Sequence, residues 1–108
     1  MRQIALALCL AFVGTAFAKV VGSFDETRLY SADKNLQTGS NMTEWRAEFM
    51  NQGATIVTTP TITPDFLATI DVFVTSHFSK ITPSTDEVNA MKAWVQAGGT
   101  LVVTGDCG

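Results

Sequence analysis

Residues 98–108 read GGTLVVTGDCG, and this stretch decides the fold. A glycine pair such as residues 98 and 99 is typical of a helix end. The continuous apolar run that follows it is typical of a strand buried on both faces of a sheet. A turn containing Gly105, Asp106 and Cys107 comes directly after that run. Because ligands and catalytic groups gather at the carboxyl ends of strands in open α/β sheets, the site is expected beside this turn.

Three further strands are predicted upstream, each rich in β-branched residues, at residues 19–24, 54–58 and 70–75, with the fourth at 100–103. Helices are predicted between them. Capping sequences at residues 41–44 (NMTE) and 84–87 (STDE) each predict a helix start, and Thr63-Pro64 predicts one short turn of helix. Glycines at 53 and at 98–99 predict the ends of the two longer helices.

Alternating strands and helices predict an α/β fold with a parallel sheet covered on both faces. Right-handed crossovers with one reversal give a flavodoxin-like, three-layer α/β/α arrangement with strand order 2-1-3-4. In that order the strongly apolar fourth strand lies at an edge, where apolar strands are unfavourable. We therefore expect residues 19–108 to form the N-terminal part of a larger, here incomplete, domain.

Residues 1–18 have the organisation of a secretory signal peptide. Arg2 supplies the positive start, residues 4–13 are apolar, and Ala16 and Ala18 occupy the small-residue cleavage positions. An uncleaved membrane anchor or a core helix is the alternative, although a bilayer span needs roughly 20 apolar residues. We expect a secreted or lumenal, extracellular product with no membrane span once the signal is removed.

The charge of the chain excludes some partners. Removing Arg2 leaves 6 basic against 10 acidic residues, a net charge of −4. With no cluster of Lys or Arg, neither nucleic acid nor a membrane surface is an expected partner. Cys9 leaves with the signal, so Cys107 is a single cysteine in an oxidising compartment. It is expected to form an intermolecular disulfide, to be a reactive thiol, or to pair with a cysteine outside this sequence.

Polar side chains follow three of the predicted strands, and the order 2-1-3-4 places those strands side by side. The candidate site residues are Asp25 and Glu26 after the first strand, Ser76 and His77 after the third, and Gly105, Asp106 and Cys107 after the fourth. A thiolate activated by imidazole and oriented by a carboxylate is one possible use of this set. A ligand-binding edge, with the loop at 25–40 and Ser76–Lys80 as its walls, is the other. No local spacing supports a metal site, and no cofactor is expected.

Other residues have both a structural and a functional interpretation. Trp45, Phe49 and Trp94 lie at helical spacing, so they are predicted as core residues, with a sugar-binding platform as the alternative. Asn41-Met42-Thr43 is an N-glycosylation sequon in a eukaryotic secretory pathway, which would make the product a glycoprotein.

Three segments resemble the class I glutamine amidotransferase-like superfamily. They are residues 23–27 (SFDET), 62–67 (ITPDFL) and 87–106 (EVNAMKAWVQAGGTLVVTGD), and the likeness covers nearly all of residues 19–108. The branches concerned are divergent and largely non-catalytic. They include trehalose-utilisation-like proteins and the amidotransferase-like domains of an intraflagellar transport subunit and of an oligosaccharyltransferase subunit.

The resemblance implies a place for Cys107. Catalytic members carry their cysteine in a Gly-x-Cys-x-Gly elbow directly after a strand, and residues 105–108 (GDCG) match the first part of it. The His and Glu partners of that cysteine come from later strands, which this sequence lacks.

Two functions are therefore predicted. The favoured one is a secreted, non-catalytic amidotransferase-like module that binds a protein or a small, sugar-related ligand at the carboxyl edge of its sheet. The alternative is a secreted thiol hydrolase or amidotransferase with Cys107 as nucleophile and His77 as base.

Overall fold

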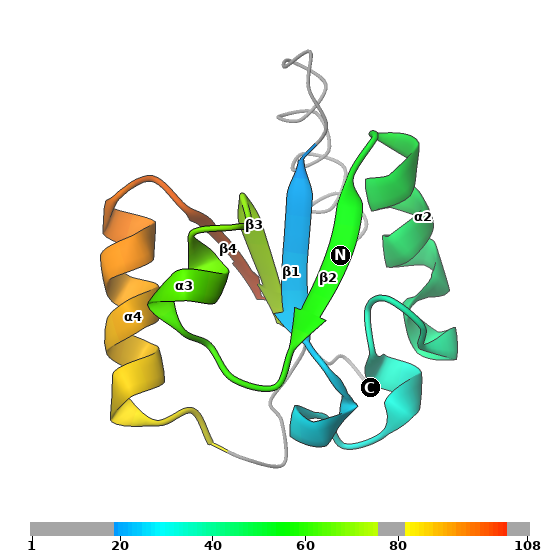
Figure 1. Ribbon diagram of the computed structural model, residues 1–108. Helices are drawn as coiled ribbons and strands as arrows, with labels where there is room; N and C mark the ends of the chain where they lie inside the picture. The colour runs from blue at the N-terminus through cyan, green and yellow to red at the C-terminus, as the bar shows by residue number, and fades with distance from the viewer. Residues whose placement is uncertain (1–18, 76–81, 104–108) are drawn as a thin grey trace.

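The computed structural model describes residues 19–75 and 82–103. Their strands form one parallel sheet of order β2-β1-β3-β4, as predicted. The strands are β1 (Val20–Phe24), β2 (Thr55–Thr59), β3 (Val72–Thr75) and β4 (Thr100–Val103). The chain leaves β1 toward β2 on one side and later returns to β3 on the other, so the direction of winding reverses between β1 and β3 (Figure 1).

Three α-helices cover the sheet. Helix α2 (Thr43–Asn51) packs on one face, whereas α3 (Pro64–Leu67) and α4 (Thr85–Gln96) pack on the other (Figure 1). This is the predicted α/β/α layering. None of the helices in the two described ranges is both long enough and apolar enough to cross a membrane.

Each face of the sheet has its own apolar core. Val72 and Val74 of β3 belong to the cluster under α2, together with Phe49. Phe73, which lies between them in sequence, belongs to the cluster under α3 and α4. Alternate residues of one strand thus point to opposite faces. Because both faces of β3 are covered, this strand is apolar throughout, as its sequence predicted. The prediction that β4 is buried on both faces is wrong, because Leu101 and Val103 are exposed on the side of α4.

The connection from β1 to α2 is ordered rather than an open loop. It contains three short 3₁₀ helices, η1 (Glu26–Arg28), η2 (Ala32–Lys34) and η3 (Ser40–Met42). Leu29 and Leu36 within it are buried, the first in the core under α3 and α4 and the second in the core under α2. The connection therefore contributes to both cores.

The two predicted capping boxes have different outcomes. Ser84 and Glu87 form one at the start of α4, with reciprocal side-chain to backbone hydrogen bonds. The prediction that Asn41 caps the other long helix is wrong, because α2 begins at Thr43 and its N-cap residue is Met42, with no side-chain cap. Asn41 lies inside η3 instead, and its Nδ2 donates to Asp33 Oδ2 at 2.7 Å.

The predicted end of α4 is confirmed by its backbone. Gly98 has a φ of +116°, a conformation that favours glycine. Gly99 then passes so close to Trp94 that a Cβ atom there would lie 2.3 Å from the indole ring. The glycine pair thus turns the chain into β4 and lets Trp94 lie against the backbone.

Candidate functional site

The carboxyl edge of the sheet is where the candidate site begins. Phe24 at the end of β1 is in register with Thr59, and Thr75 at the end of β3 is in register with Val103. The hydroxyl of Ser23 donates to the carbonyl oxygen of Val74 at 2.7 Å, in a buried position. This bond joins β1 to β3 where the winding reverses, the usual place for a ligand crevice in such sheets.

The predicted site residues Asp25 and Glu26 lie at this edge and bond within their own connection. Asp25 Oδ1 accepts from the backbone N–H of Thr27 at 2.9 Å and so caps η1. Glu26 Oε1 accepts from Asn35 Nδ2 at 2.7 Å. Asn35 is buried, and its Oδ1 accepts from the backbone N–H of Gln37 at 2.8 Å. Both carboxylates thus have a structural use in this connection.

Five predicted site residues lie outside the described residues: Ser76, His77, Gly105, Asp106 and Cys107. Their approach to one another, and to Asp25 and Glu26, stays a prediction.

A buried ion pair that the sequence analysis did not predict lies beside this edge. Arg28 Nη1 and Nη2 donate to the two carboxylate oxygens of Glu87 at 2.7 and 3.0 Å. The side chains are 7% and 6% exposed. Arg28 Nη1 also donates to the carbonyl oxygen of Pro60 at 2.9 Å, and its guanidinium carbon lies 4.5 Å from the centre of the Phe24 ring. The pair thus fastens the β1 connection to α4.

The partners of Glu87 keep it ionised. Hydrogen bonds from Arg28 lower the pKa of this carboxyl from 4.5 to about 2, with help from the backbone N–H groups of Ile62 and Ser84. Burial alone would raise the pKa, but the hydrogen bonds outweigh it. The amide distances are 2.9 Å from Ile62 and 3.0 Å from Ser84. The capping-box sequence identified one role of Glu87, but nothing in it pointed to Arg28.

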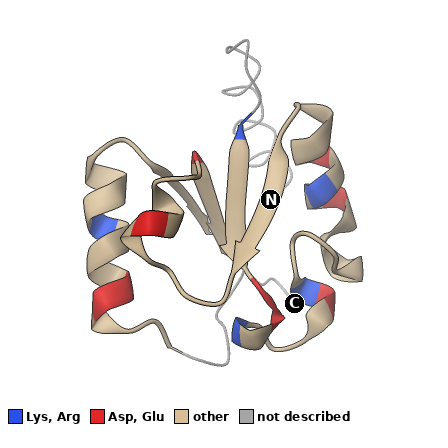
Figure 2. Ribbon diagram, in the orientation of Figure 1, with Lys and Arg blue, Asp and Glu red and all other residues tan. Residues whose placement is uncertain are grey.

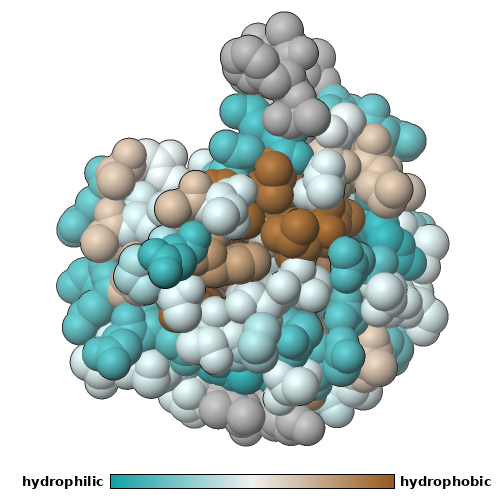
Figure 3. Space-filling model, in the orientation of Figure 1, coloured by the Kyte–Doolittle hydropathy of each residue, from teal (hydrophilic) through white to brown (hydrophobic). Residues whose placement is uncertain are grey.

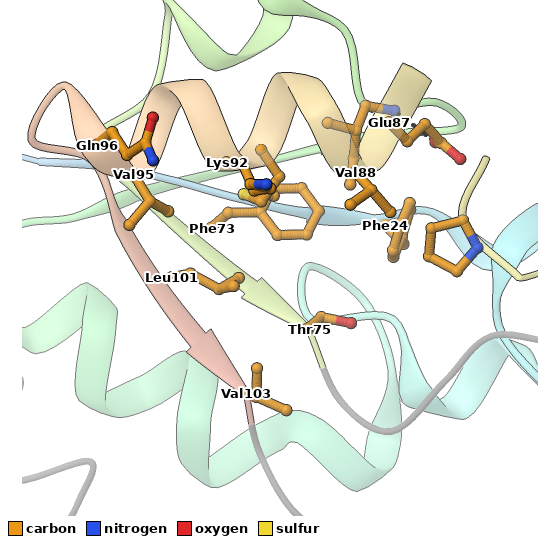
Figure 4. Close-up of a pocket in the computed structure, with 13 residues that line it drawn as sticks. Phe24, Phe73, Thr75, Glu87, Val88, Lys92, Val95, Gln96, Leu101 and Val103 are labelled. Carbon is orange, nitrogen blue, oxygen red and sulfur yellow. Dashed lines mark hydrogen bonds between the residues drawn. The ribbon is translucent and has the colours of Figure 1, made fainter. Parts of the chain in front are cut away.

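A groove lies next to the ion pair, between α4 and the β3–β4 half of the sheet (Figure 4). We call it the α4–β4 groove. Its cavity volume is about 530 Å³, within the usual range for small-molecule sites. Its apolar wall includes Phe24, Phe73, Val88, Val95, Leu101 and Val103. Because Leu101 is 39% and Val103 is 56% exposed, the groove is open along β4.

Polar groups are few in this groove. Of its charged side chains, Glu87 is neutralised by Arg28, and Lys92 projects from the middle of α4. Gln96 lies one helical turn beyond Lys92, toward the amino end of the sheet, and Thr75 lies at the end of β3. The arrangement suits a ligand with a large apolar part and few polar atoms.

The surface over the β1–β2 half of the sheet offers less. Figure 3 shows apolar surface in the middle of this view, over β1 and β2, where Val20 and Val57 are only partly buried. In the described part of the chain, Lys and Arg do not gather into a patch (Figure 2). Among the same residues, no group of three His, Cys, Asp or Glu side chains could hold a metal ion.

The predicted aromatic and glycosylation residues are also placed. Phe49 is the buried residue of α2, and the centre of its ring lies 6.1 Å from the centre of the Trp45 ring. Trp94 is partly buried and packs on the core under α4. Phe49 is therefore a core residue, as expected, whereas Trp45 and Trp94 are partly buried and pack against the two cores. Asn41 is exposed, as a glycosylated residue has to be.

Comparison of the chain with family models, curated proteins and solved structures finds no match. The resemblance to the amidotransferase-like superfamily therefore stays a prediction.

Proposed function

We propose that this chain is a secreted, non-catalytic module of the amidotransferase-like type that binds a ligand at the carboxyl edge of its sheet. The observation that carries the proposal is the α4–β4 groove. It reaches this edge at Phe24, Thr75 and Val103, the last residues of three strands. An open apolar concavity at the strand ends is the usual form of a binding site in this kind of sheet.

The state of the carboxylates also favours binding over acid–base chemistry. A general base needs a carboxylate that is available to a substrate and has a pKa near the working pH. In the described residues, Asp25 and Glu26 accept hydrogen bonds within the β1 connection, and Glu87 is buried against Arg28. Each of these groups has a structural role that proton transfer would interrupt.

The groove lining bears on the kind of ligand. A sugar presents hydroxyl groups around its whole ring, and these need matching hydrogen-bond partners. The groove offers mainly aliphatic and aromatic side chains. An apolar small molecule, or apolar side chains of a partner protein, therefore fits the proposal better than a sugar does.

The fluorescent probe 1-anilinonaphthalene-8-sulfonate tests the proposal, because its emission rises when it enters an apolar site. We expect saturable binding to the folded protein, and at least a fivefold weaker affinity for Val88→Asp, which places a charge in the groove wall. Met50→Asp is the matched control, since Met50 is 59% exposed on α2, across the sheet. Equal affinities for the two variants would overturn the proposal.

A second variant separates binding from thiol chemistry. Cys107→Ser is expected to bind the probe as the unchanged protein does. A hydrolytic activity that disappears in Cys107→Ser would support the thiol-enzyme alternative and contradict a non-catalytic module.

A further inference from the structure

Two polar side chains of α4 stand out in the α4–β4 groove. Lys92 and Gln96 both line it (Figure 4). They are four residues apart, so they lie on the same face of the helix, one turn from each other. Neither makes a hydrogen bond or an ion pair with any residue in ranges 19–75 and 82–103. An ammonium group and a carboxamide group are thus both available to one ligand.

The charge of the groove is opposite to that of the chain. The full sequence has a formal net charge of −3. In the groove, however, Arg28 neutralises Glu87, which leaves the positive charge of Lys92. Lys92 is exposed, so it can contact an anion without first losing much of its hydration. The charge therefore favours an anionic group at this point of an apolar surface.

The polar and apolar parts are arranged along one line. Helix α4 runs back toward the amino ends of the strands, so Gln96 lies at that end and Val88 lies near the carboxyl edge (Figure 4). The helix axis covers about 12 Å between these two residues, at 1.5 Å per residue. Phe73 and Phe24 lie beside this path. The ammonium and carboxamide groups thus lie in the half of the groove toward the amino ends of the strands, beside Val95, and Val88 and Val103 line the half at the carboxyl edge.

From this arrangement we infer that the α4–β4 groove binds a medium-chain fatty acid. The carboxylate accepts hydrogen bonds from Lys92 and Gln96, and the acyl chain lies along the exposed side chains of Val88, Leu101 and Val103. The inference rests on the proposed function and names the ligand class of that site. A second copy of the chain fits less well, because an isologous contact would bring two Lys92 side chains into one interface.

The two parts of the ligand contribute differently to affinity. Each methylene buried in the groove tightens binding about fourfold. The contact of the carboxylate with Lys92 takes place at an exposed site, where ion pairs contribute about two- to fivefold. Chain length is therefore expected to set the affinity, and the carboxylate to set the orientation.

Calorimetric titration of the full chain with octanoate and decanoate below their micelle concentrations, and with decanol below its solubility limit, tests the inference. Decanoate is expected to bind one molecule per chain, roughly tenfold or more tightly than octanoate. Decanol, which has the same number of carbons but no charge, is expected to bind about two- to fivefold more weakly than decanoate. Added salt should reduce that difference.

Two variants locate the carboxylate. Lys92→Met keeps the apolar stem of the side chain and removes its charge, so it should lower the affinity for decanoate to that for decanol and leave decanol binding unchanged. Lys34→Met is the matched control, because it removes the same charge from η2 and should affect neither ligand.

Several results would overturn the inference. They are equal affinity of the unchanged protein for decanoate and decanol, equal affinities of the two lysine variants for decanoate, and a dimer in sedimentation that does not bind decanoate. In the first two cases, weaker binding of the fluorescent probe to Val88→Asp than to Met50→Asp would still support the proposed function. A probe affinity independent of Val88 would remove the proposed function itself.

Discussion

Glu87 joins three separate parts of the chain through its carboxylate. It accepts hydrogen bonds from the guanidinium of Arg28 in η1, from the amide of Ile62 before α3, and from the amide of Ser84 at the start of α4. A buried carboxylate with this many partners is stable as an ion. Removing either charge of the ion pair leaves the other charge buried without a counter-charge. The ion pair is therefore a structural joint beside the groove.

The stability of Glu87→Gln, measured at several pH values, tests this role. Because the folded pKa is about 2 and the unfolded value is 4.5, the ionised carboxyl stabilises the fold above pH 4.5. That stability is lost as the pH falls from about 5 to 2. We expect the variant to be less stable at pH 7 by about 3 kcal/mol, measured by urea unfolding. The difference should narrow as the pH falls below 5.

Glu44→Gln is the control for this experiment, since Glu44 is exposed on α2. Its stability should differ from that of the unchanged protein by at most about 0.5 kcal/mol at pH 7. A Glu87→Gln difference that is the same at pH 7 and pH 3 would contradict the account.

At the scale of elements, similar capping sequences have different outcomes. Ser84 has the extended backbone of an N-cap residue, with ψ at 166°. Asn41 and Met42 belong to η3, whose backbone already turns before α2 begins at Thr43. A local motif predicts a helix start only where the preceding chain can enter the helix in an extended conformation.

Ser84→Ala and Asn41→Ala form a matched pair for this point. Ser84→Ala should lower the free energy of unfolding by about 1 kcal/mol, because the N–H of Glu87 loses its partner. Asn41→Ala should lower it by no more than about 0.5 kcal/mol, because its bond to Asp33 is exposed. Urea unfolding of both variants measures the difference. An equal loss in the two variants would show that Asn41 has the capping role after all.

At the scale of the whole molecule, the strand order follows from features that are local in sequence. Apolar runs, helix ends and alternating elements leave few topologies once crossovers are right-handed. The order β2-β1-β3-β4 was predicted on these grounds and is confirmed.

The ion pair and the groove depend on tertiary structure, and the sequence did not predict them. Arg28 and Glu87 are 59 residues apart and meet because the β1 connection folds back into the core. The groove depends on where α4 lies over the sheet. Trp94 and Met91 pack on the core, which leaves the outer side of α4 and the face of β4 uncovered. The edge position of an apolar fourth strand was the sequence feature that pointed toward this surface.

The same substitution on the two faces of β4 is expected to change the free energy of unfolding by very different amounts. Val102 is 9% exposed and belongs to the core under α2, whereas Val103 is 56% exposed in the groove. Val102→Lys is expected to destabilise the protein by more than about 3 kcal/mol, because it buries an unpaired charge. Val103→Lys should change stability by at most about 0.5 kcal/mol and weaken probe binding. Thermal unfolding that ranks the two variants in the other order would contradict the face assignment.

The central claim is that the α4–β4 groove is the binding site, and methyl NMR of the protein with decanoate tests it most directly. We expect intermolecular nuclear Overhauser effects from the acyl chain to the methyl groups of Val88, Leu101 and Val103. The methyl groups of Met50, which is exposed on α2, and of Ile56, which lies in the core under α2, should show none. Contacts confined to the α2 side, or their absence at Val88 and Leu101 when decanoate is bound, would contradict the account.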